Sequence, residues 1–129
     1  LNNSPTLVMK DGEFVLAVGT PGGETIGQTQ FQMLLNVFDF GLGIQQAIEA
    51  PRLALSADPN FYRPGAEIAL RVESRMAPSV VSRLAELGHT VELVAPYSLG
   101  NMQGILRNLD TGTMTAGGDP RRMMYAVGW

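Results

Sequence analysis

The residues best suited to chemistry lie in one glycine-rich corner of the sequence, Gly19-Thr20-Pro21-Gly22-Gly23. An apolar run over 14–18 precedes this corner and is typical of a buried strand. Apolar side chains at helical spacing follow it, at Phe31, Leu34, Leu35, Phe38 and Leu42. A chain that passes from a strand to a helix start through two glycines leaves backbone N–H groups without side-chain cover. Such N–H groups, with the helix dipole behind them, can hold a negatively charged oxygen.

The same five residues also have a simpler interpretation. Pro-Gly is a common turn dipeptide, because proline fixes one φ and glycine supplies the positive φ of a type II turn. The local sequence alone favours this plain turn over an anion-binding loop. Residues elsewhere in the chain must therefore decide between the two interpretations.

The composition limits the classes of function. The 129 residues, 45% hydrophobic and 16% charged, are typical of one globular domain, and no apolar run is long enough to cross a bilayer. The net charge of −3 argues against nucleic acid or an anionic membrane surface as the main partner. Because there is no cysteine and His89 is the only histidine, the sequence does not favour a thiolate nucleophile, a metal centre or a serine–histidine relay. We expect no metal and no cofactor.

The remaining pattern predicts an α+β domain with a mainly antiparallel sheet. Two apolar runs, 6–10 and 13–18, meet at Lys10-Asp11-Gly12, which is a strong hairpin signal. The segment 52–66 contains two turn clusters and is predicted to be irregular. The other expected elements are helices over about 26–41, 44–49 and 78–87, strands over 67–72 and 91–94, and a hairpin of 101–109 with 113–117.

Six short motifs, in order and at the spacing of one family, carry a resemblance. They are Asn3-Ser4-Pro5-Thr6, Lys10-Asp11-Gly12, Gly19-Thr20-Pro21-Gly22-Gly23, Asn36-Val37-Phe38-Asp39-Phe40-Gly41, Glu49-Ala50-Pro51-Arg52 and Asp119-Pro120-Arg121-Arg122. Each motif alone is weak, but six in register are specific. From residue 2 or 3 to its end, the sequence resembles the C-terminal part of the small subunit of γ-glutamyltranspeptidases and their close relatives.

The resemblance implies the four-layer αββα fold of the N-terminal-nucleophile hydrolases, of which 1–129 would be a single-domain fragment. In that family a precursor cuts itself, and the threonine that then begins the small subunit is the nucleophile, with its free α-amine as the base. Paired glycines of the Pro-Gly-Gly loop donate N–H groups to the oxyanion of the tetrahedral intermediate. By resemblance Gly22 and Gly23 take this catalytic role, and Asn2, Asn3 and Pro21 contact the substrate. In this context the oxyanion interpretation is favoured over the plain turn.

Departures from the family pattern affect the nucleophile and the substrate. The nucleophilic threonine is not in this sequence, so we expect the chain alone to be inactive. Because the surface of its partner is missing, we also expect the chain alone to be marginally stable or to self-associate. Its expected partner is the remainder of the same precursor, namely the large subunit and the N-terminal part of the small subunit. Leu1 and Asn2 occupy the positions of a Ser-Ser pair that contacts the substrate α-carboxylate in relatives. Asn2 can still donate a hydrogen bond there, whereas Leu1 cannot.

The resemblance leaves three hypotheses for the function. The first is transfer of a γ-glutamyl group from a small-molecule amide such as glutathione to water or an amine. The second is an acylase of the same fold with a glutaryl-type preference, because the stretch 28–32 is closer to family members that include acylases. The third is a degenerate member without catalysis. The sequence does not fix the compartment, although the resemblance favours a periplasmic or secreted protein.

Two arginine-containing motifs have structural interpretations beside their functional ones. Arg52 either binds a substrate carboxylate through its guanidinium or anchors the segment that follows it. Asp119, with Arg121 and Arg122, is predicted to be a locally paired group that fixes the tail of the chain.

Overall fold

The computed structural model describes residues 4–128, which divide into two compact units. One unit combines the chain up to Ala50 with the chain from Gly100 onward, and the other is Pro51–Leu99. The glycine corner lies in the first of these units. Each unit is built around its own β-sheet.

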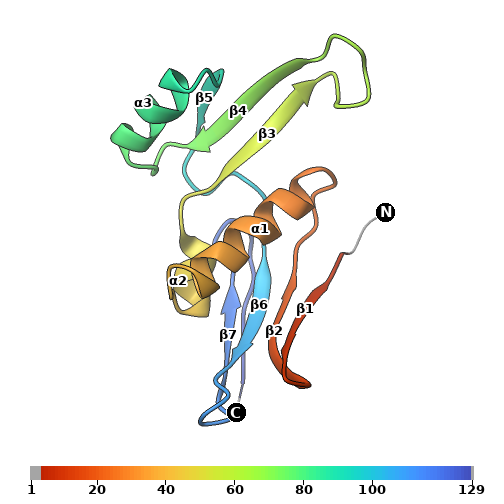
Figure 1. Ribbon diagram of the computed structural model, residues 1–129, viewed down its shortest axis with the longest axis vertical. Helices are drawn as coiled ribbons and strands as arrows, with labels where there is room; N and C mark the ends of the chain where they lie inside the picture. Colours follow the sequence, from red (N-terminus) through yellow and green to blue (C-terminus); the bar gives the residue numbers. More distant parts are fainter. Residues whose placement is uncertain (1–3, 129) are drawn as a thin grey trace. The chain divides into compact units, whose positions relative to one another are not determined.

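The sheet of the first unit has four antiparallel strands in the order β1-β2-β6-β7 (Figure 1). The strands are β1 (Thr6–Lys10), β2 (Glu13–Gly19), β6 (Gln103–Arg107) and β7 (Met114–Gly118). The predicted first hairpin is confirmed, because Asp11 and Gly12 form its turn with φ of 51° and 83°. Both hairpin turns lie at one end of the sheet, and the glycine corner that follows β2 lies at the other end (Figure 1).

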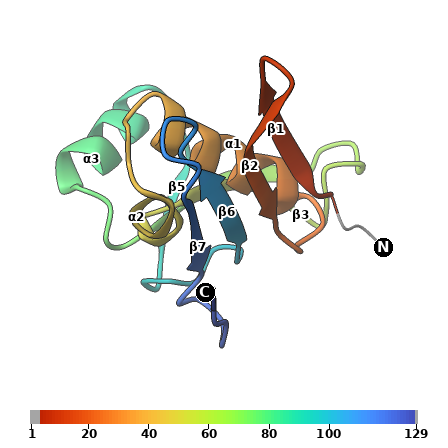
Figure 2. The same cartoon turned by 90° about the horizontal axis from the view of Figure 1, so that it is seen from below.

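Two helices, α1 (Thr25–Phe38) and α2 (Ile44–Glu49), pack against this sheet and form the core with it. In Figure 2, α2 lies beside β6 and β7. The buried core comes from β2, from both helices and from the residue that precedes β6. It consists of Val15, Leu16, Val18, Met33, Val37, Ile44, Ala47, Ile48 and Met102.

The face of α1 that packs on the sheet differs from the predicted one. Phe31 and Phe38, which belong to the predicted apolar stripe, are 61% and 48% exposed. The buried residues of the helix are instead Ile26, Thr29, Gln30, Met33 and Val37. The prediction counted only apolar side chains. A glutamine can be buried when its amide is hydrogen-bonded, as that of Gln30 is.

Helix α2 approaches the sheet closely because two facing strand positions are glycines. Gly104 of β6 and Gly117 of β7 are register partners. A Cβ atom added to Gly104 would lie 3.1 Å from the Ile44 Cδ1 atom, and one added to Gly117 would lie 2.8 Å from the Ile48 Cδ1 atom. The two glycines therefore make room for the apolar side chains of α2.

Gly117→Ala and Gly27→Ala are expected to change stability in opposite directions. At Gly117 the new methyl group would overpack the buried Ile48, which is expected to lower the free energy of unfolding by about 1–3 kcal/mol. Gly27 lies in α1 with open space around its Cβ position, so alanine there is expected to raise that free energy by about 0.5–1 kcal/mol. Urea unfolding of the two variants measures both values. A stabilised Gly117→Ala variant would contradict the close packing of α2.

The opposite face of the four-stranded sheet carries an apolar row. Leu7, Ala17, Ile105 and Ala116 are paired in register across β1, β2, β6 and β7. Leu7 is 67% exposed and Ile105 is 41% exposed. A sheet with helices on one face and an apolar row on the other corresponds to one α-layer and one β-layer of an αββα sandwich.

The second unit is a three-stranded sheet with one helix. Its strands are β3 (Leu53–Asp58), β4 (Glu67–Glu73) and β5 (Val91–Val94), in the order β3-β4-β5. β3 and β4 are antiparallel, whereas β4 and β5 are parallel and are connected through α3 (Pro78–Glu86). The sheets of the chain are thus mainly antiparallel, as the sequence predicts.

Strand β3 corrects the prediction that 52–66 is irregular. The sequence of β3, Leu-Ala-Leu-Ser-Ala-Asp, contains no β-branched or aromatic residue, so its intrinsic preference for a strand is weak. Its pairing comes from β4, with which it is in register from Leu53 opposite Val72 to Asp58 opposite Glu67. A partner strand outweighs local propensity here, and only the later part of the segment is irregular.

Candidate functional site

The glycine corner links the end of β2 to the start of α1 over residues 20–24. The carbonyl oxygens of Gly22 and Gly23 accept hydrogen bonds from the backbone N–H groups of Thr25 and Ile26, each at 3.2 Å. These two bonds belong to the start of the helix. The N–H groups of Gly22 and Gly23 donate to no residue within 4–128. The corner therefore uses the glycine carbonyls for structure, and the glycine amides have no acceptor within the described part of the chain.

The plain-turn alternative predicts that one of these amides, that of Gly23, is hydrogen-bonded within the loop. A closed turn over Thr20–Gly23 would have the Gly23 N–H donate to the Thr20 carbonyl, and that bond is absent from the described residues. The φ of Gly22 is also +136°, well beyond the value of about 80° expected for the third position of a type II turn. The geometry of the described residues therefore differs from that of a closed type II turn.

Glycine is required at the two positions for different reasons. At Gly22 an added Cβ would lie 2.6 Å from the Thr25 Oγ1 atom. At Gly23 the φ is +59°, a left-handed conformation that favours glycine, but nothing among the described residues lies within 4 Å of the Cβ position. Open space in front of Gly23 is consistent with approach of another molecule to the backbone.

Two threonine side chains, one on each side of the loop, form hydrogen bonds to its backbone, and neither was among the predicted site residues. Thr20 is 4% exposed, and its hydroxyl is a donor shared between the carbonyl oxygen of Pro21, at 2.9 Å, and the backbone carbonyl of Asn101. The Thr25 hydroxyl donates to the carbonyl of Gly22 at 3.0 Å. The sequence feature that could have identified Thr20 and Thr25 is the presence of a threonine on each side of Pro-Gly-Gly. Pro21 itself is exposed.

The predicted substrate residues Asn2 and Asn3 lie outside the described residues. The chain that follows them is attached to α1 through Gln30. The Gln30 amide donates to the carbonyl of Ser4, and the Thr6 hydroxyl donates to Gln30 Oε1 at 3.2 Å. Gln30 is 9% exposed, so this contact links the beginning of β1 to the interior of the unit.

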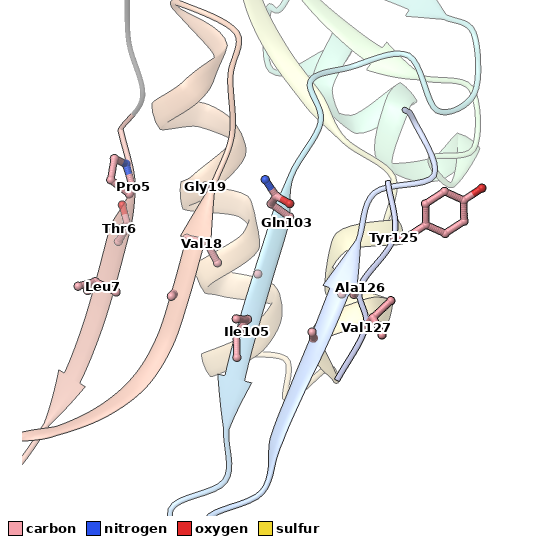
Figure 3. A pocket seen from close by; sticks show the side chains of 14 residues that line it. Pro5, Thr6, Leu7, Val18, Gly19, Gln103, Ile105, Tyr125, Ala126 and Val127 are labelled. Atoms are coloured by element: carbon pink, nitrogen blue, oxygen red, sulfur yellow. The ribbon is translucent and has the colours of Figure 1, made fainter. Parts of the chain in front are cut away.

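A cavity of about 430 Å³ lies on the open face of the sheet in the first unit (Figure 3). Its lining includes Leu7, Ile105 and Gly19, together with the tail residues Tyr125 and Val127. Gly22 and Gly23 do not line it and are exposed. The cavity therefore reaches the β2 end of the glycine corner, but it is not enclosed around the two glycine amides.

Arg52 is an anchor in the second unit. Its side chain is buried, and its Nη1 atom donates to the Leu99 carbonyl at 3.2 Å. The fully buried Glu73 carboxylate accepts hydrogen bonds from the backbone N–H groups of Arg52, Ser98 and Leu99 at 3.2, 3.0 and 3.1 Å. These contacts support the anchoring interpretation of Arg52, because its guanidinium is held by protein groups.

The Asp119 cluster agrees with the interpretation as a local pair that fixes the tail. The Arg121 guanidinium lies 3.1 Å from Asp119 Oδ1, and both side chains are buried. Arg121 also donates to the carbonyls of Ile48 and Ala50, at the end of α2, at 3.0 and 2.9 Å. Arg122, in contrast, is exposed.

Residues 4–128 bring together no group of three or more histidine, cysteine, aspartate or glutamate side chains that could hold a metal ion. Within the same residues, no helix has both the length and the apolar character needed to cross a membrane.

Comparison with known proteins connects this geometry to a family. The chain is 36% identical over 118 residues to the glutathione hydrolase proenzyme of Escherichia coli (strain K12), covering 92% of this chain and 18% of that protein. It is 31% identical over 112 residues to the acylase ACY 1 proenzyme of Pseudomonas sp. (strain V22), covering 87% of this chain and again 18% of the relative. The chain thus spans less than a fifth of the length of each of these curated relatives.

A solved structure and a family profile extend the comparison over nearly the whole chain. The γ-glutamyltranspeptidase from Pseudomonas nitroreducens complexed with L-DON matches with a TM-score of 0.78 and 28% identity, over 98% of this chain and 62% of that one. The fold is accordingly α+β, part of the four-layer αββα sandwich of the N-terminal-nucleophile hydrolases. The profile of the family described as gamma-glutamyltranspeptidase matches residues 2–129. By fold and by sequence, this chain belongs to the gamma-glutamyltranspeptidase family.

Proposed function

We propose that this chain is the C-terminal part of the small subunit of a γ-glutamyltranspeptidase-like enzyme. The enzyme would transfer a γ-glutamyl group from an amide such as glutathione to water or to an amine. In this proposal Gly22 and Gly23 supply the oxyanion-binding amides, and a threonine from the remainder of the protein supplies the nucleophile. Asn2, Asn3 and Pro21 contact the substrate.

The observation that carries the proposal is that the carbonyls and the N–H groups of Gly22 and Gly23 are used differently. The carbonyls of Gly22 and Gly23 accept the first bonds of α1, whereas their N–H groups donate to no described residue. An amide of an exposed glycine that bonds to none of residues 4–128 and lies next to a helix start is suited to receive an anionic oxygen. Two such amides in sequence match the two donors that an acyl-transfer site needs.

The chemistry assigns the two amides a role in the transition state. The threonine hydroxyl attacks the amide carbonyl carbon and passes its proton to the α-amine of the same residue, which then protonates the leaving amine. Negative charge develops on the carbonyl oxygen as the new C–O bond forms. Fixed N–H donors at that oxygen stabilise the transition state more than the ground state, and therefore raise kcat. Water or an acceptor amine then resolves the resulting ester.

The remainder of the protein has a surface to occupy on this chain. The apolar row of Leu7, Ala17, Ile105 and Ala116 faces away from the helices of its own unit. We propose that a second sheet from the rest of the precursor covers this row. Such packing would bring another segment close to the cavity that reaches Gly19.

The full-length protein provides the test of this function. We expect it to be cleaved into two subunits, with a threonine at the start of the smaller one, and to release p-nitroaniline from γ-glutamyl-p-nitroanilide. N-terminal sequencing of the small subunit and absorbance assays measure the two results. A full-length protein that has no threonine at the predicted cleavage point, or that folds without cleavage and activity, would instead support the degenerate-member hypothesis.

The acylase alternative is favoured by one observation, the 31% identity to an acylase proenzyme. A γ-glutamyl group and a glutaryl group both carry a terminal carboxylate, but only the γ-glutamyl group has an α-amino group. Comparing γ-glutamyl and glutaryl anilides on the full-length enzyme therefore separates the two. Asn2→Ala is expected to raise KM for both anilides, because the carboxylate that Asn2 would contact is common to them. A higher kcat/KM for the glutaryl anilide would favour the acylase.

A further inference from the structure

We infer that Thr20 and Thr25 are positioning residues that orient the Gly22 and Gly23 amides through the carbonyls of the same peptide groups. This inference rests on the proposed oxyanion role of the two glycines. It assigns a function to two side chains that flank the loop and that do not contact the reacting atoms.

Because the peptide group is planar, a carbonyl and the N–H that follows it cannot be oriented independently. The carbonyl of one residue and the N–H of the next lie in one rigid plane, and in a trans peptide they point in opposite directions. Neither the Pro21–Gly22 bond nor the Gly22–Gly23 bond is cis. Whatever holds the Pro21 carbonyl therefore also orients the Gly22 N–H, and whatever holds the Gly22 carbonyl orients the Gly23 N–H.

Thr20 holds the first of these planes. Its hydroxyl donates to the Pro21 carbonyl oxygen at 2.9 Å and shares this proton with the backbone carbonyl of Asn101, which precedes β6. The side chain is 4% exposed, so the hydroxyl is fixed within the unit. Since the Pro21 carbonyl faces this buried hydroxyl, the N–H of Gly22 is directed away from it.

Thr25 holds the second plane. Its hydroxyl and its backbone N–H both donate to the Gly22 carbonyl, at 3.0 and 3.2 Å. The Gly22 carbonyl is thereby fixed at the start of α1, and the N–H of Gly23 is directed away from the helix. Unlike the Pro21 carbonyl, the Gly22 carbonyl keeps its backbone donor when the threonine hydroxyl is removed.

A loop with two glycines needs such external contacts. Glycine has the largest backbone freedom of any residue, so adjacent glycines do not fix their own amides. An oxyanion donor works only when it is already placed for the developing charge. Loss of the hydroxyl of Thr20 or Thr25 should therefore lower kcat and leave KM nearly unchanged.

The test uses the full-length enzyme and γ-glutamyl-p-nitroanilide, with kcat expressed per mole of folded protein. Thr20→Val, which keeps the shape and removes the hydroxyl, is expected to lower kcat by about 10- to 100-fold. Thr25→Val is expected to have a smaller effect of about 3- to 10-fold, because the backbone donor remains. Thr20→Ser and Thr25→Ser restore a hydroxyl and are expected to recover most of kcat.

Thr29→Val is the matched control. Thr29 has the same 4% exposure as Thr20, but it lies inside α1 and none of the described residues is hydrogen-bonded to its hydroxyl. We expect this variant to keep the kcat of the parent enzyme. If Thr20→Val does not fold, comparison of kcat for Thr25→Val and Thr25→Ser still tests the role of the hydroxyl. Thr25 is only half-buried, so its variants are expected to fold.

The outcomes separate this inference from the proposed function. If alanine at Gly22 lowers kcat but both valine variants match the parent enzyme, the positioning role is wrong and the oxyanion assignment stands. If serine and valine at position 20 lower kcat equally, packing rather than the hydroxyl is responsible, and the inference is again wrong. If neither Gly22→Ala nor Gly23→Ala changes kcat, the oxyanion assignment itself fails.

Discussion

Gly22→Ala in the full-length enzyme is expected to lower kcat by about 100- to 1,000-fold, the loss that accompanies removal of one oxyanion donor. The new Cβ would lie 2.6 Å from the Thr25 Oγ1 atom, so the hydroxyl that holds the Gly22 carbonyl must move. The φ of +136° is also unfavourable for alanine, and the peptide group is expected to rotate. Steady-state kinetics with γ-glutamyl-p-nitroanilide measure kcat and KM separately, and KM is expected to change little.

Gly23→Ala is expected to lower kcat as well, but by less than Gly22→Ala does. Its φ of +59° lies in the left-handed region that alanine adopts at a cost of about 1–2 kcal/mol, and its Cβ would meet nothing among the described residues. We therefore expect a smaller loss of kcat than at Gly22 as long as the backbone keeps its conformation. A bulky substrate acyl group that approaches this amide would increase the loss.

Gly112→Ala is the matched control for Gly23→Ala, and it shows what alanine at a positive φ does away from the glycine corner. Gly112 lies in the β6–β7 turn with a φ of +72° and open space at its Cβ position, which closely matches Gly23. That turn lies at the end of the sheet opposite the glycine corner (Figure 1). We expect the control to lower thermal stability slightly and to keep kcat. Equal kcat values for the Gly22→Ala, Gly23→Ala and Gly112→Ala variants would contradict the oxyanion assignment.

The sequence predicts the strand–glycine–helix corner because its signals are local. Gly19-Thr20-Pro21-Gly22-Gly23 combines residues with special backbone preferences, a short continuous apolar run precedes it, and apolar residues at helical spacing follow it. The Asp11-Gly12 hairpin is predictable for the same reason, since both residues adopt positive φ in the structure. In these segments the local preference and the type of each element agree, although the buried face of α1 differs from the predicted one.

Other features depend on contacts between distant residues. Strand β3 is paired by β4, although its own residues have little strand preference. Gln30 is buried because Ser4 and Thr6, more than twenty residues earlier, satisfy its amide. Thr20 bonds to a carbonyl 81 positions away in the sequence. No periodicity in a single sequence identifies such partners, which is why the anchors of the candidate site became apparent only in the structure.

Arg121→Met is expected to lower the free energy of unfolding by about 3–5 kcal/mol, the typical effect of removing one partner of a buried ion pair. The substitution would leave the buried Asp119 carboxylate without the guanidinium, which lies 3.1 Å from it. It would also remove the donors to the Ile48 and Ala50 carbonyls at the end of α2. Urea unfolding of the full-length protein measures the change, and Arg122→Met, at the exposed neighbouring position, is expected to alter stability by less than about 0.5 kcal/mol.

A double-mutant cycle can separate the ion pair from the contact with the helix. Asp119→Leu combined with Arg121→Met removes both charges, so the double variant should be less destabilised than the sum of the two single variants. The carbonyls of Ile48 and Ala50 still lose their donors, and we therefore expect the double variant to remain less stable than the parent protein. Arg121→Lys keeps the charge, but a single ammonium does not reproduce the planar fork that reaches Asp119 and two carbonyls at once, so an intermediate loss is expected. Two results together would contradict this role of the guanidinium. The losses in free energy of unfolding of the two single variants would add up to that of the double variant, and Arg121→Lys would be as stable as the parent protein.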